Sequence, residues 1–292
     1  MFLYKQNLYI IELLTWEYRC LTLRKKGYIM KLTFIGCGNM GQAMLKGILG
    51  SEKLRGTEII ATARSRETLA RLEKDYGIHT TEDNKKAASW GDIVILAVKP
   101  QMYEAVLGEI KEELKDKLIV SIAAGKSLRQ LEELLGTDKK LIRAMPNTPA
   151  MVLEGITALC PNKNIEEEEL NTIEDIFSAF GKTEVIEEKQ MDAFIGICGS
   201  SPAYVFMFIE ALADGAVKEG LPRAKAYRMA AQAVLGSAKL VLESGKHPGE
   251  LKDMVCSPGG TTIEAVAALE EYGFRSSVIK AVERCSEKSR TM

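Results

Sequence analysis

A glycine-rich segment near the start of the chain has the spacing GxGxxG and reads Gly36-Cys37-Gly38-Asn39-Met40-Gly41. In this spacing the first glycine forms a tight turn, the second lets a pyrophosphate approach the backbone, and the third lets a helix pack closely on a strand. Free N–H groups at the start of the helix then bind the phosphates. Glycine-rich turns are common, but this one follows directly on an apolar segment typical of a strand. We therefore predict a dinucleotide site.

The second predicted strand, 58–62, is followed by Arg64, Ser65 and Arg66. Proteins that bind NAD usually end this strand with Asp or Glu, which accepts a hydrogen bond from the ribose 2′-hydroxyl. The segment 61–66 contains no carboxylate that would repel a 2′-phosphate, and its two guanidinium groups and hydroxyl can bind one. Two surface arginines also fit a solvated loop, but their position favours NADPH, with NADH as the alternative cofactor.

Two later loops are predicted at the carboxyl ends of strands, where open α/β sheets bind their ligands. They read Ala97-Val98-Lys99-Pro100 and Ala123-Ala124-Gly125. Their small residues would let a cofactor lie against the backbone, although each loop alone indicates only a turn.

A second glycine-rich loop leads into a predicted helix, 263–272, and reads Ser257-Pro258-Gly259-Gly260-Thr261-Thr262. Thr261, with Glu264 three residues later, fits a capping box, which leaves the hydroxyl of Thr262 free at the first turn. The N–H groups of Gly259 and Gly260, beside a positive helix end, would bind a carboxylate. From the residues alone, a substrate pocket and a mere helix start are equally good interpretations.

The composition limits the partners that the chain can have. Its 292 residues include 39 Lys and Arg against 40 Asp and Glu, for a net charge of −1. This balance argues against binding of nucleic acid or an anionic membrane, so the expected ligand is small. Six cysteines without a CxxC pair, and only two histidines (His79 and His247), give no zinc-binding spacing. We expect free cysteines, no bound metal and a reducing, cytoplasmic setting.

Residues 30–188 alternate short apolar segments with amphipathic ones, such as the predicted helices 66–76 and 102–114. This alternation predicts parallel strands joined by crossover helices. The acidic run 166–169 is interpreted as the solvated first turn of a helix. The expected strands are 32–35, 58–62, 92–98, 118–122, 141–144, 157–160 and 183–186.

Residues 189–292 lack strand patterns and are predicted to be helical. Ser201 fits an N-cap, with Pro202 at the first helical position. The run 203–209 is apolar all round, so we expect burial on every side, partly by another subunit. Gly220 is expected to end this helix, and a second helix is expected between Pro222 and Gly245. Two more are predicted at 263–272 and 274–289.

Residues 1–29 differ from the remainder of the chain. Their apolar run, Leu8–Ile11, is broken by Glu12, and no small-residue cleavage site follows it, so we expect neither a membrane span nor a signal peptide. An amphipathic helix that packs on the body is one interpretation. We expect instead that this extension is not native and that translation begins at Met30, since the first strand starts at Lys31. The N-terminal mass of the natively expressed protein tests this expectation, and an intact Met1 terminus contradicts it.

Taken together, these motifs resemble the pyrroline-5-carboxylate reductase family from about Met30 to the last helix. Several blocks in the same order are more specific than any single motif. The matching blocks are Gly36–Gly41, Ala97–Pro100, Met145–Pro149, Gly199–Tyr204, His247–Gly249 and Ser257–Thr262. Ser201 and Cys198 stand where many relatives carry glycine and serine, which are also small.

The resemblance implies an α/β Rossmann dinucleotide-binding domain (30–188) followed by an all-α dimerisation and substrate domain (189–292). It implies reduction of 1-pyrroline-5-carboxylate to L-proline with NADPH, a homodimer with intertwined helical domains, and assembly of dimers into rings such as a decamer. Asn84 matches a family position near the adenosine ribose. Thr262 matches the threonine that hydrogen-bonds the substrate nitrogen.

Two other functions are weighed against this one. A 3-hydroxyacid dehydrogenase shares the two-domain plan but uses a lysine on the interdomain helix, and the stretch 190–209 contains none. A non-enzymatic, NADPH-sensing relative could dispense with the second glycine-rich loop, which is intact here.

Overall fold

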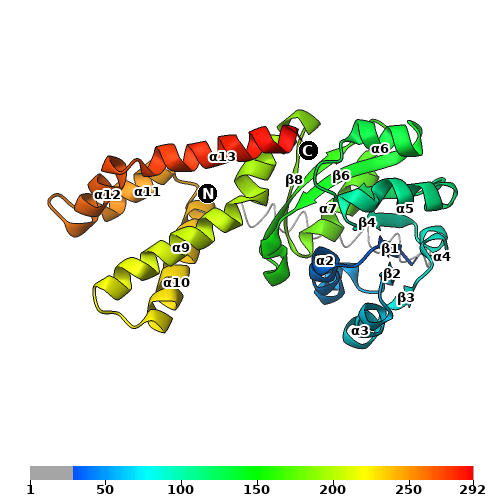
Figure 1. The fold of residues 1–292 in the computed structure, drawn as a ribbon, viewed down its shortest axis with the longest axis horizontal. Helices are drawn as coiled ribbons and strands as arrows, with labels where there is room; N and C mark the ends of the chain where they lie inside the picture. Colours follow the sequence, from blue (N-terminus) through cyan, green and yellow to red (C-terminus); the bar gives the residue numbers. More distant parts are fainter. Residues whose placement is uncertain (1–28, 292) are drawn as a thin grey trace, which may run out of the picture. The chain divides into compact units, whose positions relative to one another are not determined.

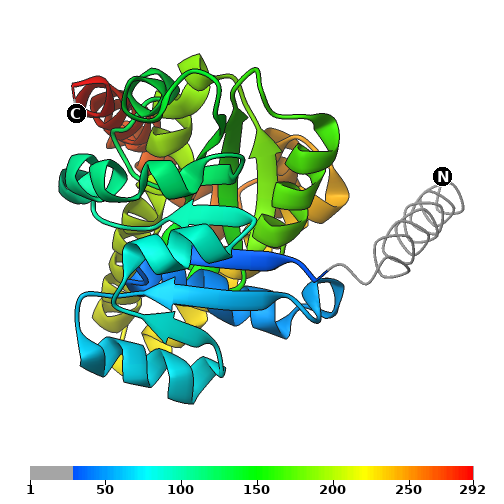
Figure 2. The ribbon, with the colours of Figure 1, turned by 90° about the vertical axis from the view of Figure 1, so that its right-hand side faces the viewer.

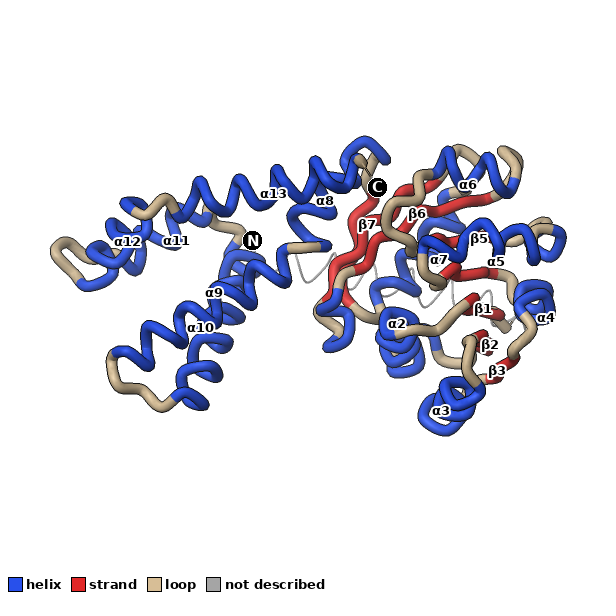
Figure 3. Tube along the Cα trace, viewed as in Figure 1, coloured by secondary structure: helices blue, strands red, loops and turns tan. Residues whose placement is uncertain are grey.

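The computed structural model describes residues 29–291, and the chain divides between Glu188 and Lys189 into two compact units (Figures 1 and 3). The predicted fold class is confirmed, since an α/β unit is followed by an all-helical one. The expectations for the N-terminal extension fall outside the described residues, apart from Ile29.

One sheet forms the centre of the first unit, in the order β3-β2-β1-β4-β5-β6-β7-β8. Its strands are β1 (Lys31–Ile35), β2 (Glu58–Thr62), β3 (His79–Thr81), β4 (Ile93–Leu96), β5 (Leu118–Ser121), β6 (Lys140–Pro146), β7 (Gly155–Pro161) and β8 (Gly181–Val185). The expectation of a wholly parallel sheet is wrong for one pair, because β6 and β7 are antiparallel. Only the eight residues 147–154 join these two strands, and a parallel pair would need a crossover of about a dozen residues or more. Strand β3 was not predicted, because its three residues carry no apolar run.

The α-helices of this unit form two groups that cover the two faces of the sheet, as the end-on view in Figure 2 shows. One group contains α2 (Asn39–Gly50), α3 (Arg66–Tyr76) and α7 (Glu167–Ser178), and the other contains α4 (Asn84–Trp90), α5 (Tyr103–Ile110) and α6 (Leu128–Leu135). Short 3₁₀ turns are η1 (Glu52–Leu54), η2 (Pro100–Met102), η3 (Glu112–Leu114), η4 (Thr148–Val152) and η5 (Glu188–Gln190). The helix expected at 102–114 is therefore α5 with a 3₁₀ turn at each end. The acidic run opens α7 as expected, with Glu166 and Glu169 in a capping box.

The last residue of the first unit is anchored to the sheet. Oε1 of Glu188 accepts hydrogen bonds from the guanidinium of Arg143 on β6 (2.9 Å) and from the N–H of Leu128 (2.7 Å). Arg143 is almost fully buried. A charge-assisted hydrogen bond at a buried site is stronger than the same bond in water, so the Arg143–Glu188 pair fixes the end of this unit to the sheet.

The second unit consists of helices. They are α8 (Met191–Phe194), the π-helix η6 (Ile195–Gly199), α9 (Ser201–Lys218), α10 (Arg223–Ser244), α11 (Pro248–Val255), α12 (Thr261–Glu271) and α13 (Phe274–Arg290). The expected N-cap at Ser201 is wrong, because the chain is already helical from Met191 and Ser200 has right-handed helical angles. Pro202, which has no N–H, lies in the first turn after the π-helix, where the helical ladder is already irregular. The sequence analysis also missed α11.

The second unit has almost no core of its own. Among its described residues, only eight are buried: Met191, Phe194, Ile195, Gly196, Ala213, Ala226, Ala230 and Ser286. The expectation that the apolar run of α9 is buried is wrong for the single chain, where Phe206 is 64% exposed and Met207 69%. Large exposed apolar surfaces mark binding sites for other molecules.

Candidate functional site

The predicted glycine turn lies where the strand order reverses, between β1 and β4. Open α/β sheets bind ligands at this switch point. Gly36 has a φ of +80°, and a Cβ there would lie 2.6 Å from Cγ1 of Val98, in the loop after β4. The N–H of Gly36 also donates to the hydroxyl of Thr62 at the end of β2 (2.9 Å). The fold therefore brings together the segments after β1, β2 and β4.

The N-terminus of α2 is open to an anion. Its N-cap, Gly38, makes no side-chain capping bond, and a Cβ placed on Gly38 would meet nothing within 4 Å. The first bond of the helix runs from the N–H of Gln42 to the carbonyl of Gly38. The N–H groups of Asn39, Met40 and Gly41 therefore have no acceptor within the helix. Such a cradle fits a pyrophosphate, as the sequence predicts.

Cys37 supports this turn. Gly41 lies so close to Cys37 that a Cβ on Gly41 would be 3.0 Å from the Sγ of Cys37. The thiol is only 3% exposed, and burial raises the pKa of Cys37 to about 12. Burial disfavours the thiolate, which is the reactive form, and so favours a packing role for Cys37. The five described cysteines are free, as expected, while Cys20 lies outside the described residues.

The loop after β2 differs from the prediction in one respect. Ser65 acts as the N-cap of α3 and accepts a hydrogen bond from the N–H of Thr68, and Arg64 is exposed. Arg66 donates twice to Glu82, which follows β3. The segment 61–66 has no carboxylate, but the fold supplies one from the neighbouring strand. Glu82 was not predicted at this site because β3, which positions it, was not predicted.

Asn84 is the first residue of α4, two positions after Glu82, and its side chain donates to Glu109 of α5 (3.1 Å). The described chain thus places Asn84 on the same edge of the sheet as Arg66.

A buried bridge holds the two predicted loops after β4 and β5. The hydroxyl of Tyr103 contacts the carbonyl of Leu96 and the hydroxyl of Ser121, both at 2.9 Å, across the ends of these strands. Burial raises the pKa of Tyr103, so this bridge keeps its proton. Directly after β5, Ala123 is buried and Ala124 half-buried. Lys99 in the other loop is exposed.

The second glycine-rich loop forms a tight turn between α11 and α12. The N–H of Gly260 donates to the carbonyl of Ser257 (3.0 Å), and Gly259 has a φ of +66° after Pro258, the pattern of a type II turn. A Cβ on Gly260 would lie 2.5 Å from the Oγ of Ser257. The turn therefore requires glycine at position 259, whereas a side chain at position 260 would displace the hydroxyl of Ser257.

The predicted capping box at Thr261 is wrong. The N-cap of α12 is Gly260, Thr261 is the first helical residue, and no side chain caps the helix. Glycine is tolerated at an N-cap, so the turn can place it there. Three N–H groups, of Thr261, Thr262 and Ile263, consequently remain without an acceptor in the helix. Thr262 is half-buried in the first turn, and its hydroxyl has no hydrogen bond within residues 29–291.

Two motif residues prove to have structural roles that the sequence analysis did not assign. Nδ1 of His247 caps α11 by accepting from the N–H of Gly249 (3.0 Å). Oδ1 of the buried Asn147 accepts from the N–H of Ile156 (2.9 Å), which fixes the turn from β6 to β7.

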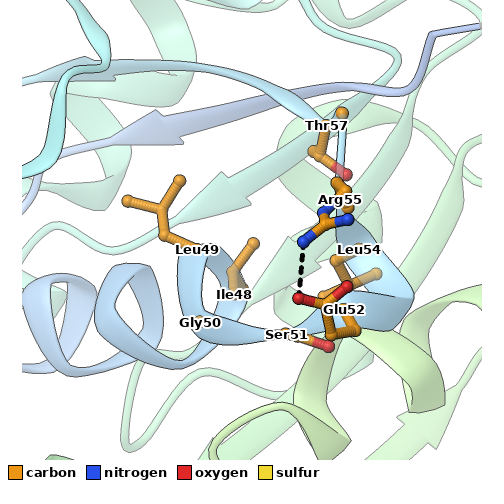
Figure 4. Close-up of a pocket in the computed structure, with 9 residues that line it drawn as sticks. Ile48, Leu49, Gly50, Ser51, Glu52, Leu54, Arg55 and Thr57 are labelled. Atoms are coloured by element: carbon orange, nitrogen blue, oxygen red, sulfur yellow. Dashed lines mark hydrogen bonds and ion pairs between the residues drawn. The ribbon is translucent and has the colours of Figure 1, made fainter.

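A cavity of 180 Å³ lies elsewhere on the first unit (Figure 4). It is lined by residues 48–52 and 54–57, and the ion pair between Arg55 and Glu52 lies across it. It adjoins the amino end of β2, whereas the glycine turn lies at the carboxyl ends of the strands. None of the predicted site residues lines it.

Comparisons with known proteins identify relatives of both units. Residues 188–292 match the family model described as pyrroline-5-carboxylate reductase dimerisation, and residues 31–125 match NADP oxidoreductase coenzyme F420-dependent. Pyrroline-5-carboxylate reductase of Escherichia coli is 54% identical over 260 residues, which cover 89% of this chain and 97% of that protein.

Two solved structures are also similar over most of their length. The pyrroline-5-carboxylate reductase of Coxiella burnetii has a TM-score of 0.86 at 34% identity, covering 90% of this chain and 98% of that one. The pyrroline carboxylate reductase of Plasmodium falciparum with NADP bound has a TM-score of 0.81 at 36% identity, covering 90% and 97%.

The two glycines of the turn should respond differently to substitution. In Gly38→Ala the new methyl group meets open space, so the free energy of unfolding should fall by no more than about 1 kcal/mol, the difference between Gly and Ala as an N-cap. NADPH binding should weaken by about tenfold or more, because the methyl group keeps a pyrophosphate from the backbone. Urea unfolding and calorimetric titration with NADPH measure the two effects. In the comparison variant, Gly36→Ala, the methyl group meets Val98, so stability itself should fall. Unchanged NADPH binding by Gly38→Ala would refute the assignment of this turn.

Proposed function

Because the chain belongs to the pyrroline-5-carboxylate reductase family, we propose that it reduces 1-pyrroline-5-carboxylate to L-proline with NADPH or NADH, the last step of proline synthesis. The observation that carries the proposal is the open N-terminus of α2 at the switch point of the sheet, in a chain that also has the open N-terminus of α12. Each can bind one anionic group, the first a pyrophosphate and the second a carboxylate.

The residues proposed to hold the cofactor surround the carboxyl ends of β1, β2, β4 and β5. The N–H groups of the glycine turn bind the pyrophosphate, and Arg64 and Arg66 bind the 2′-phosphate. Asn84 lies near the adenosine ribose. The loops at 97–100 and 123–124 form a backbone surface for the remainder of the dinucleotide, since their residues are mostly small.

The residues proposed to hold the substrate belong to the loop 257–262. The N–H groups at the start of α12 bind the substrate carboxylate, and the hydroxyl of Thr262 hydrogen-bonds the ring nitrogen. The nicotinamide supplies the hydride when it is bound, so the protein contributes position and electrostatics. A protonated imine is already electrophilic, and orientation of this kind contributes at most about 7–11 kcal/mol.

We further propose that the second unit forms a homodimer whose helices intertwine, and that dimers assemble into a ring such as a decamer. The continuous helical stretch Glu188–Lys218, which ends with α9, is long and apolar enough to cross a membrane, and its most apolar 18-residue window has a mean hydropathy of 1.5. Its match to a dimerisation family supports burial by a second copy instead. Because a net charge of −1 does not attract nucleic acid or anionic lipid, the protein is proposed to act in the cytoplasm.

The role of Thr262 is testable by substitution. Thr262→Ala should lower kcat for pyrroline-5-carboxylate by about tenfold or more, because the substrate nitrogen loses its hydrogen-bond partner. The dissociation constant for NADPH should stay within about twofold. Thr262→Ser, which keeps the hydroxyl, should retain most of the activity. An undiminished kcat in Thr262→Ala would refute this role.

The dimer is testable through the exposed apolar face of α9. Phe206→Glu places a charge where the second copy should pack, so we expect loss of the dimer in size-exclusion chromatography with light scattering. The matched control is Leu49→Glu on α2, since Leu49 is also exposed, at 44%, but belongs to the first unit. That variant should keep the oligomer. A parent protein that is soluble only in detergent would favour a membrane for this helix.

A further inference from the structure

Glu82 is placed by the fold beside the segment proposed to bind the 2′-phosphate. Strands β2 and β3 are parallel and end in register, with Thr62 opposite Thr81. The residues that follow them, Ala63–Arg66 and Glu82, therefore emerge side by side. No other carboxylate makes a hydrogen bond or ion pair with Arg66 in the described part of the chain.

The contact between Arg66 and Glu82 is a two-point ion pair. Nε of Arg66 donates to Oε1 of Glu82 at 2.9 Å, and a second guanidinium nitrogen donates to Oε2 at 3.2 Å. The side chains are 87% and 52% exposed. The hydrogen bond from Arg66 lowers the pKa of Glu82, so the carboxylate is charged at neutral pH. An ion pair this exposed contributes little to stability, and other anions can compete for it.

We infer that Glu82 is a specificity-determining residue, which weakens binding of NADPH relative to NADH. The inference depends on the proposed function, because it concerns the same cofactor site. A 2′-phosphate must share the guanidinium of Arg66 with Glu82, and it also meets the negative charge of that carboxylate. A 2′-hydroxyl carries no charge to repel, and it can donate a hydrogen bond to a carboxylate at this edge of the sheet.

Glu82 thus supplies, from a neighbouring strand end, the carboxylate that the loop after β2 lacks. NAD-binding proteins carry an acidic residue on the second strand itself, whereas this chain presents arginines there and takes its carboxylate from the third strand. The positive charge of Arg66 favours a 2′-phosphate on the ribose, and the negative charge of Glu82 disfavours one. The ratio of the dissociation constants for NADPH and NADH depends on both charges, and Glu82 is the residue that favours NADH.

Glu82→Gln tests the inference by binding alone, without turnover. Calorimetric titration of the full-length protein should give a dissociation constant for NADPH about three- to tenfold lower than that of the parent, as expected for removal of one competing and repelling surface charge. The constant for NADH should stay equal or rise. The gain for NADPH should shrink as NaCl is raised from about 50 to 300 mM, because salt screens exposed charges.

The matched control is Glu73→Gln. Glu73 is also an exposed carboxylate of this region, but it lies two helical turns along α3 from Arg66 and is bonded to Thr80. This variant removes the same charge and should leave the ratio of the two constants unchanged.

An unchanged ratio in Glu82→Gln, or an equal change in Glu73→Gln, would overturn the inference while leaving the proposed function intact. Weaker NADPH binding in Glu82→Gln would also overturn it, since that result would mean that Glu82 holds Arg66 in its binding position. A parent protein that binds neither cofactor would refute the proposed function and this inference together.

Discussion

The close contact between Gly36 and Val98 is the constraint on which the cofactor half of the protein depends. It lets the turn after β1 lie against the loop after β4, and a side chain at position 36 would force them apart. The positive φ of Gly36 directs the chain into α2 so that Gly38 is the N-cap with open space beside it. The partial positive charge of the helix end is thereby presented at the switch point of the sheet, where the strand order leaves room for a ligand.

The two units reach stability by different means. The first encloses an apolar core between its sheet and two layers of helices, with residues such as Phe34, Phe177 and Phe180 fully buried. The second buries mainly small side chains, such as Ala213 and Ala226, and leaves Phe206 and Met207 exposed. A chain of about one hundred residues does not offset its conformational entropy in this way. The proposed association with a second copy would supply the missing apolar burial.

The sequence predicted the parts of the fold that depend on local patterns. Apolar runs located seven of the eight strands, and α3 and the αL cap at Gly245 were located to the residue, because periodicity and capping chemistry are local. Strand β3 was missed because His79-Thr80-Thr81 draws its stability from pairing with β2. The antiparallel β6–β7 pair was missed because strand direction depends on the turn that Asn147 fixes.

In the candidate sites, too, the features set by local sequence were predicted, and those that depend on distant residues were not. The glycine spacing predicted the turn after β1, and the arginines after β2 were located correctly. Glu82 could not be assigned to them, since its contact with Arg66 spans sixteen residues and requires β3. At the second loop the residues were identified but the cap was placed one position too late, because Gly260 and Thr261 can both serve as an N-cap.

The central claim is that the open helix ends of α2 and α12 bind the two anionic groups of one reaction. A crystal structure with NADP⁺ and L-proline bound tests it most directly. We predict pyrophosphate oxygens about 3 Å from the N–H groups of residues 39–41, and the proline carboxylate at the same distance from those of residues 261–263. A cofactor or a proline bound at any other part of the protein would contradict it.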